Sequence, residues 1–167
     1  SVISLGRRAL FENAMNCKCS AGTGSLMDIL RDLLDVPAVE TAYALAEAAP
    51  RAWKSNATCA VFLMEEARRM QARGIPAAEI LASCCHAIVE NMARTLWTQV
   101  TIPPNPVVLL HGQTMKSDPL ALATVNCLEA HGRGPVYGLV PPDPGHRACY
   151  GLLNRAVRIA DRQGRLF

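Results

Sequence analysis

The chain has 167 residues, of which half are hydrophobic and 5% are aromatic, and a formal net charge of +3. This length is typical of one domain with a core large enough to need no disulfide. The charge is mild and the arginines lack interleaved aromatic residues, which argues against a nucleic-acid-binding surface. No apolar run approaches the roughly 20 residues of a membrane helix, and the N-terminus does not resemble a signal peptide. We therefore expect a single cytoplasmic domain over residues 1–167, with its seven cysteines reduced.

Helices predominate in the first two-thirds of the chain. Residues 2–16 predict a short strand or hairpin centred on Leu10 and Phe11. Beyond it, apolar residues at helical spacing and flanking Pro and Gly residues predict four helices. These helices are expected over residues 25–36, 37–49, 58–74 (with Thr58 as N-cap and Gly74 just past the end) and 76–100.

The last third of the chain predicts alternating strands and helices. The expected elements are a short buried strand over 107–112, a helix over 117–132 capped by Ser117 or Asp118, a strand over 135–140 and a helix over about 146–162. This order is typical of a βαβ unit with parallel strands and a right-handed crossover. The fold class is therefore a helix-rich α/β fold.

Four of the cysteines fall on apolar helix faces. Cys127 and Cys149 follow the apolar stripes of their helices, and Cys84 and Cys85 continue the stripe of the helix over 76–100. Buried cysteine commonly acts as a small hydrophobic residue. We therefore predict that these four pack in the core. For Cys84 and Cys85 a metal site with His86 is disfavoured, because an adjacent cysteine pair has poor spacing for a metal chelate.

Cys17, Cys19 and Cys59 differ because each stands just before a predicted helix. The unpaired amides of a helix N-terminus favour thiolate and donate to the sulfurs of an iron–sulfur cluster. A four-iron cluster needs about four thiolates, which two copies of the chain can supply around a two-fold axis. A zinc site built from Cys17, Cys19, Cys59 and His86, or a purely structural loop, stays open on spacing alone.

Two cysteine motifs and three further stretches resemble one known family. They are MNCKCSAGTGSLMDIL (15–30, similar to MNDKCAAGTGxFLE), SNATCAVFLMEEARRM (55–70, similar to SxxCTVFAESEV), EILASCCHAIVENMAR (79–94), VVLLHGQTMKSDPL (107–120) and GHRACYGLLNRAV (145–157). The family is the activator ATPases of 2-hydroxyacyl-CoA dehydratases and their relatives in benzoyl-CoA reductases. The resemblance covers about residues 9–158, and the two cysteine motifs are its specific part.

The resemblance implies part of an actin-like, ribonuclease H-like ATPase fold, as in acetate kinase, sugar kinases and heat-shock chaperone ATPases. It also implies a cytoplasmic homodimer that holds one [4Fe-4S] cluster, ligated by Cys19 and Cys59 of each subunit. ATP and magnesium then drive a low-potential electron into a partner dehydratase or reductase. Cys17 stands where the family usually has Asp, which makes it a bystander.

The same resemblance assigns the nucleotide and cluster loops. Gly22, Thr23 and Gly24 form the turn after the first cluster ligand, and Gly112 and Gln113 correspond to the glycine-rich adenosine loop. No residue is matched to a catalytic role, and the acyl-CoA substrate is not identified.

Several departures accompany the match. The DxGS and DxGGQD-like phosphate loops of the family do not occur, so the chain resembles the second, cluster-bearing half of an activator without the N-terminal phosphate-loop half. His111 precedes Gly112 where two glycines are usual, and Met64 replaces a family glutamate whereas Glu66 is retained. We expect the chain alone to bind ATP weakly or not at all, because magnesium and phosphate lose most of their ligands. Whether it is itself an enzyme stays undecided.

Two other functions remain as alternatives to the activator. One is a non-catalytic interaction domain of the same fold that binds neither cluster nor ATP. The other is half of a sugar or acetate-type kinase, in which the cysteines are incidental.

Overall fold

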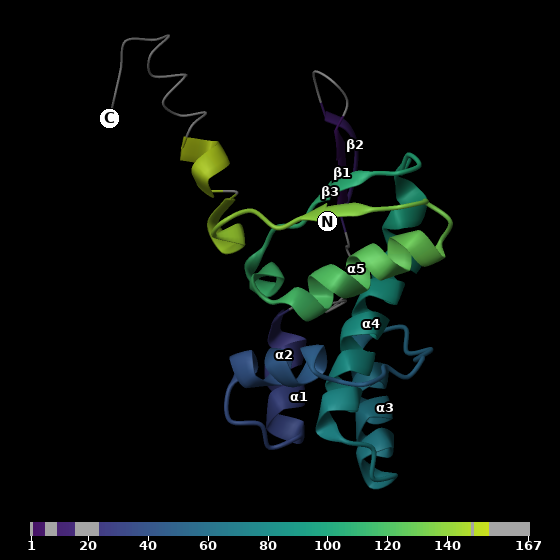
Figure 1. Ribbon diagram of the computed structural model, residues 1–167, viewed down its shortest axis with the longest axis vertical. Coiled ribbons are helices and arrows are strands. Elements are labelled where there is room, and N and C mark those ends of the chain that lie inside the picture. The colour runs from purple at the N-terminus through teal and green to yellow at the C-terminus, as the bar shows by residue number, and fades with distance from the viewer. Residues whose placement is uncertain (1, 6–9, 16–23, 148, 154–167) are drawn as a thin grey trace.

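The structure, a computed structural model, describes residues 2–5, 10–15, 24–147 and 149–153, and it is organised around one long helix (Figure 1). This helix, α4 (Ala77–Thr95), is buried on most of its circumference, which is typical of a helix at the centre of a core. Four helices surround it or pack on its neighbours: α1 (Gly24–Leu33), α2 (Val39–Glu47), α3 (Ala60–Ala72) and α5 (Asp118–Ala130). Among the described residues, no helix is long and apolar enough to cross a membrane.

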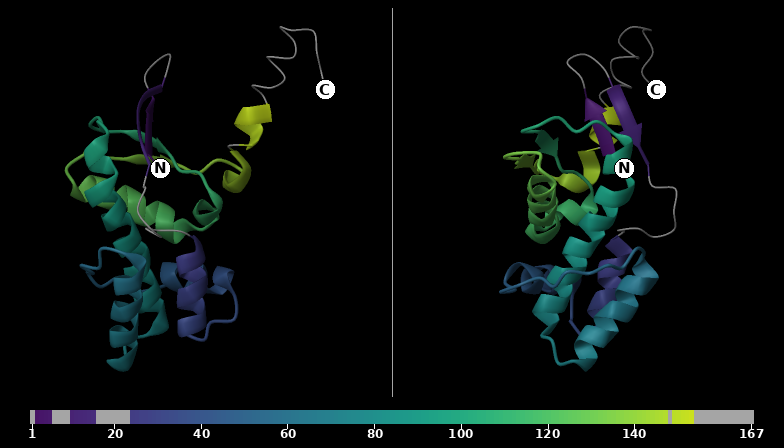
Figure 2. Two further views of the ribbon diagram at one scale, coloured as in Figure 1. Left: turned by 180° about the vertical axis from the view of Figure 1, so that it is seen from behind. Right: turned by 90° about the vertical axis from the view of Figure 1, so that its right-hand side faces the viewer.

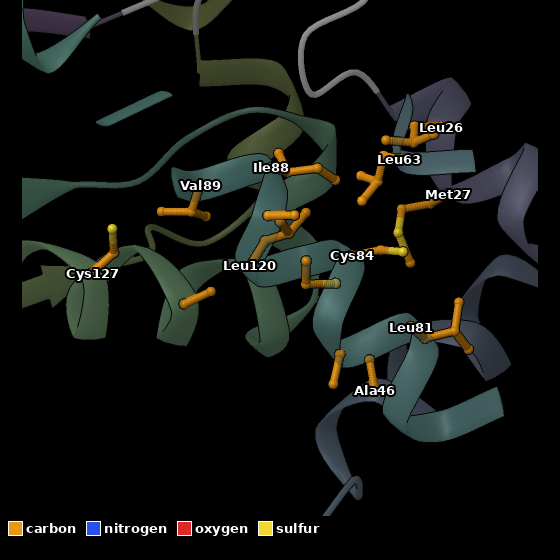
Figure 3. Close-up of a cluster of buried hydrophobic side chains, with 14 of the residues drawn as sticks. Leu26, Met27, Ala46, Leu63, Leu81, Cys84, Ile88, Val89, Leu120 and Cys127 are labelled. Atoms are coloured by element: carbon orange, nitrogen blue, oxygen red, sulfur yellow. The ribbon is translucent and has the colours of Figure 1, made fainter. Parts of the chain in front are cut away.

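The core forms where these helices meet α4. Figure 3 shows side chains of α1, α2, α3 and α5 gathered around those of α4, with Cys84 beside Met27 and Cys127 at the opposite end of the cluster. Fully burying one Leu or Ile side chain contributes about 1.5–3 kcal/mol. Leu30, Ile80 and Leu81 are completely inaccessible to solvent. The expected helical core is therefore confirmed.

The helix ends follow local backbone rules. At the end of α3, Gly74 has a φ of 74°, and the Ile75 amide donates to the Met70 carbonyl at 3.1 Å. This is the left-handed termination that the sequence predicts at Gly74. The same turn closes α1 at Asp35 (φ 54°), where the Val36 amide donates to the Arg31 carbonyl, so α1 ends before the predicted residue 36.

Other helix boundaries also differ from the predictions, and α2 is shorter at both ends than the predicted 37–49. Cys59, and not Thr58, is the N-cap of α3, whereas Ser117 is the N-cap of α5 as expected. The helix predicted to reach residue 100 ends at Thr95 and continues as the 3-10 turn η1 (Trp97–Gln99). At this point the Thr95 hydroxyl donates to the Asn91 carbonyl at 2.6 Å, and the side-chain Nε2 of Gln99 donates to the Thr95 carbonyl at 2.5 Å. Such side-chain bonds compete with the helical ladder.

A hairpin and a small parallel sheet lie at one end of α4, and α1, α2 and α3 pack along the other end (Figure 2). Strands β1 (Val2–Leu5) and β2 (Leu10–Ala14) pair antiparallel, which confirms the predicted hairpin, with a register shift between Ser4 and Leu5. The Glu12 carboxylate of β2 accepts the Thr101 amide at 2.5 Å and so ties the hairpin to the segment after η1.

The predicted βαβ unit is present. Strands β3 (Val107–Leu109) and β4 (Tyr137–Leu139) pair in parallel, with α5 between them in the chain. Side chains of α5 cover one side of this sheet, where Gly138 is needed because a Cβ there would lie 2.8 Å from Val125 Cγ2. The other side is open, since Val107 is 75% and Tyr137 65% exposed. The prediction that the first strand is buried is therefore wrong for this structure.

The thiols divide into two classes. Cys84, Cys85 and Cys127 are buried, as predicted. Cys149 is exposed, so its predicted core position is wrong: residues 149–153 are helical, yet no described element covers the side that carries Leu152 and Leu153. The rest of the helix predicted to residue 162 lies outside the described residues.

The buried thiols make the free energy of unfolding fall at alkaline pH. Burial raises the pKa of Cys85 from its ordinary value of 9.0 to about 12, and burial also raises that of Cys84. Between these values the unfolded chain has lost the Cys85 proton and the folded chain has kept it. The unfolded state then binds fewer protons, so the free energy of unfolding falls as pH rises above 9.

We predict that Cys85→Ala flattens this fall by up to about 1.4 kcal/mol per pH unit, the limit for one titrating group. Urea unfolding under reducing conditions, at a series of pH values from about 8 upward, measures the slope. Cys149→Ala is the matched control, because its thiol is exposed in both states. Equal slopes for the native chain and Cys85→Ala contradict the prediction.

Candidate functional site

Cys59 caps the amino end of α3, as the sequence predicts for a cluster ligand at the start of a helix. Its backbone is extended (φ −151°, ψ 170°), its carbonyl accepts the Leu63 amide at 3.0 Å, and its thiol is half-buried and free. The first amides of this 13-residue helix have no partner within the helix, and the helix dipole is positive there. Cys59 therefore stands at the end of the helix that favours negative charge.

A buried serine shapes the segment that leads into Cys59. The Ser55 hydroxyl donates to the carboxylate of Glu66 on α3 and accepts the Ala57 amide at 3.1 Å. Ser55 is 7% exposed, so these groups have little access to competing water. The serine and the retained glutamate of the second cysteine motif thus act together to hold the turn before the cysteine.

A second anchor joins the same segment to α4. The Trp53 backbone amide donates to Ser83 Oγ, and its indole nitrogen donates to Glu79 Oε2, both at 2.7 Å. Arg51 Nε lies 3.5 Å from Glu79 Oε1, which pairs the buried carboxylate with a positive charge. Sequence reasoning missed this cluster, for which the only signals were a tryptophan in a polar stretch and a glutamate in an apolar helix.

An open cleft of about 450 Å³ borders the Cys59 turn. It is lined by Asn56, Ala57, Thr58, Phe62, Glu65, Glu66, Arg69, Met70 and Arg73. Val61 and Phe62, in the first turn of α3, are 73% and 62% exposed. The surface next to the cysteine is thus partly apolar and accessible.

Gly112 and Gln113 lie at the carboxyl end of β3. Gly112 has a φ of 118°, which favours glycine, and its amide donates to the Pro144 carbonyl at 2.9 Å. Gln113 begins the 3-10 turn η2 (Gln113–Lys116), and its side chain covers Gly145, where a Cβ would lie 2.3 Å from the amide oxygen. The loops after β3 and β4 therefore meet, at the sheet edge where open parallel sheets usually bind ligands.

The second of these loops contains a polar cluster that sequence reasoning missed. Asp143 has a φ of 51° and precedes the 3-10 turn η3 (Pro144–His146). His146 Nδ1 lies 2.8 Å from Asp143 Oδ1, and the Tyr150 hydroxyl donates to Oδ2 at 3.0 Å. These two bonds lower the pKa of Asp143, and the bond to the carboxylate raises that of Tyr150. The signal in the sequence was an aspartate in a proline-rich turn, followed by histidine three residues later.

The structure tests only some of the predicted site residues. Cys17, Cys19, Gly22 and Thr23 lie outside the described residues, and Gly24 is the first residue of α1. Cys59 and the pair Gly112–Gln113 stand on separate elements, the start of α3 and the end of β3. The pairing of Cys19 with Cys59, and the zinc alternative with His86, stay predictions.

Comparison with known proteins identifies the family. The family model described as the BadF/BadG/BcrA/BcrD ATPase family matches residues 2–153. The chain belongs to this family. Among curated proteins, none matches the chain significantly.

Two solved structures share the fold. One is the activator of the 2-hydroxyisocaproyl-CoA dehydratase from Clostridium difficile with bound ADPNP, at 19% identity and a TM-score of 0.68. The other is component A of the (R)-2-hydroxyglutaryl-CoA dehydratase from Acidaminococcus fermentans, at 22% identity and a TM-score of 0.67. Each match covers 82% of this chain but 47% and 50% of those chains, so the chain spans about half their length. The expected helix-rich part of an actin-like ATPase fold is thereby confirmed.

We predict that Ser55→Ala lowers the free energy of unfolding by about 1–3 kcal/mol, the usual effect of leaving a buried polar partner unsatisfied. It also speeds alkylation of Cys59, because the turn before the cysteine loosens. Denaturant unfolding and alkylation followed by peptide mass mapping measure the two effects. Thr58→Ala, at an exposed neighbouring position, is the control and should stay within about 0.5 kcal/mol of the native chain. If both variants change stability and the alkylation rate equally, Ser55 does not hold the turn before Cys59.

Proposed function

We propose that the chain is the cluster-bearing part of an ATP-dependent activator that delivers electrons to a 2-hydroxyacyl-CoA dehydratase or a benzoyl-CoA reductase-type enzyme. The observation that carries the proposal is the placement of Cys59 at the amino end of α3, held by Ser55 and Glu66. Family membership and the activator fold support it. In the proposal the chain acts in the cytoplasm, where thiols stay reduced.

The residues present fit an iron–sulfur cluster. Cys59 supplies a free, half-buried thiol, and the first amides of α3 are available as donors to cluster sulfur. In the proposal, Cys19 and Cys59 of each of two subunits hold one [4Fe-4S] cluster, with Gly22, Thr23 and Gly24 as the turn beside Cys19. The cluster supplies a one-electron redox centre. The exposed Val61 and Phe62 beside Cys59 fit a surface covered by the second subunit.

Nucleotide binding is assigned to the carboxyl edge of the β3–β4 sheet. Gly112 and Gln113 take the place of the adenosine loop, next to the loop that carries Asp143 and His146. The phosphates and magnesium need further ligands, which the proposal assigns to a phosphate-loop half in the same chain or in another. The open side of the sheet, with Val107, Leu109, Tyr137 and Leu139 exposed, fits contact with that half.

The mechanism that follows is gating. Nucleotide state would bias the relative orientation of two subunits, and Cys59 of each subunit would hold the cluster where that orientation can control its redox chemistry. Electron delivery is then confined to the docked, ATP-bound arrangement. The residues of this chain contribute by fixing Cys59, because the Ser55–Glu66 and Trp53–Glu79 bonds prevent the ligand turn from moving independently of α3 and α4.

We predict about four irons per dimer after anaerobic purification, the content of one cluster held by four thiolates. Cys19→Ala or Cys59→Ala should abolish iron and sulfide binding, whereas the control Cys149→Ala, at an exposed cysteine, should keep both. Chemical iron and sulfide analysis and the visible absorption spectrum measure the outcome. Full iron content in the double variant Cys19→Ala/Cys59→Ala would falsify the assignment.

The same preparation separates the alternatives. A folded protein without iron under strictly anaerobic conditions indicates the non-catalytic interaction domain. ATP-dependent phosphorylation of a sugar or of acetate, after addition of a phosphate-loop half, indicates the kinase.

A further inference from the structure

Three metal-ligating side chains converge at the other end of α4 from the Trp53 anchor. They are Glu90 of α4, Cys127 of α5 and His131, the C-cap residue of α5, and one ligand atom of each lies within 4.8 Å of the others. Cys127 and His131 are four residues apart, so they share one face of the helix. The His131 amide donates to the Cys127 carbonyl at 3.0 Å, which fixes the two residues relative to each other.

The spacing agrees with that of a tetrahedral metal centre. Cys127 Sγ lies 3.4 Å from Glu90 Oε1. Zinc bonds to sulfur and oxygen place two such ligands about 3.6 Å apart in a tetrahedral site. The corresponding ligand atom of His131 lies within 4.8 Å of both.

Neighbouring groups orient two of the three side chains. The Trp97 ring meets the His131 ring edge-on, with centroids 6.2 Å apart and an interplanar angle of 87°. Arg94 Nη2 lies 3.8 Å from Glu90 Oε2, the oxygen that does not face Cys127. These contacts limit the orientations that the imidazole and the carboxylate can take.

The cluster of Glu90, Cys127 and His131 is buried on one side and open to solvent on the other. Cys127 is 5% exposed, Glu90 is half-buried and His131 is exposed. A metal ion between them therefore has protein on the thiol side and access to water on the histidine side. Three protein ligands with one water-accessible position is the usual arrangement of an open zinc site.

We propose that Glu90, Cys127 and His131 bind a divalent transition-metal ion of the zinc class, with water as the fourth ligand. The thiol and imidazole select such an ion over calcium or magnesium, which prefer oxygen ligands only. On binding, the Cys127 thiol releases its proton to solvent, and the thiolate and carboxylate together balance the charge of the ion. The site shares no residue with the cysteines proposed to hold the iron–sulfur cluster, so neither proposal depends on the other.

The test uses Co²⁺ as the probe, in the full chain carrying Cys17→Ser, Cys19→Ser and Cys59→Ser so that those thiols do not contribute. We expect one equivalent of Co²⁺ to bind with a thiolate-to-cobalt charge-transfer band and visible bands of a tetrahedral site. Cys127→Ser should remove the charge-transfer band, and His131→Ala and Glu90→Gln should each weaken Co²⁺ binding at least tenfold. Zn²⁺ should displace Co²⁺ and raise the melting temperature of the background protein.

Cys149→Ser and His146→Ala are the matched controls, since they remove an exposed cysteine and an exposed histidine elsewhere. Both should leave Co²⁺ affinity unchanged. If Cys127→Ser does not fold, His131→Ala decides the question, because His131 is exposed and its loss leaves the core intact. The proposal is overturned if Co²⁺ does not bind, or if it binds with the same affinity and spectrum to His131→Ala.

Discussion

The near-complete burial of α4 is the constraint on which the rest of the structure depends. A helix buried on most of its circumference can keep a polar side chain in the core only if that side chain finds a partner, because an unpaired buried charge or hydroxyl is costly. Glu79 and Ser83 meet this demand by binding Trp53. The result is that an extended segment without its own secondary structure is fixed against the core. Cys59 follows directly on this segment.

The same reasoning applies at the opposite end of α4, where Glu90 faces α5. Its carboxylate contacts Cys127 and Arg94, so the otherwise apolar junction between α4 and α5 includes one polar contact. One end of the helix thus positions the proposed cluster ligand, and the other faces the helix that supports the small sheet. A rigid, buried helix that contacts both regions is a physical connection between them.

The family match and the exposed surfaces are consistent with one another. The chain spans about half the length of two activators of the same fold, and its parallel sheet is covered on one side only. In the proposed function, exposed apolar strand residues such as Val107 and Leu109 contact a further part of that fold, since large exposed apolar patches commonly mark interaction surfaces. The exposed Leu152 and Leu153 fit such a contact for the same reason.

Local patterns in the sequence were sufficient for much of the fold. Helical periodicity, the left-handed stop at Gly74 and the strand–helix–strand order depend on neighbouring residues, so the core helices, the hairpin and the parallel pairing were predictable. The placement of Cys59 at a helix start was predictable for the same reason. Its exact role as N-cap was not, because boundaries shift by a residue or two.

Only the tertiary structure decided which distant residues meet. The pairing of Trp53 with Glu79, the cluster of Glu90 with Cys127 and His131, and the exposure of Cys149 all depend on how elements far apart in the sequence pack. An apolar stripe shows that a face can be buried, but it does not show whether another element is there to bury it. The correct predictions mainly concern secondary structure, which depends on residues that are neighbours along the chain. The corrected ones mainly concern burial, which depends on how distant elements pack in space.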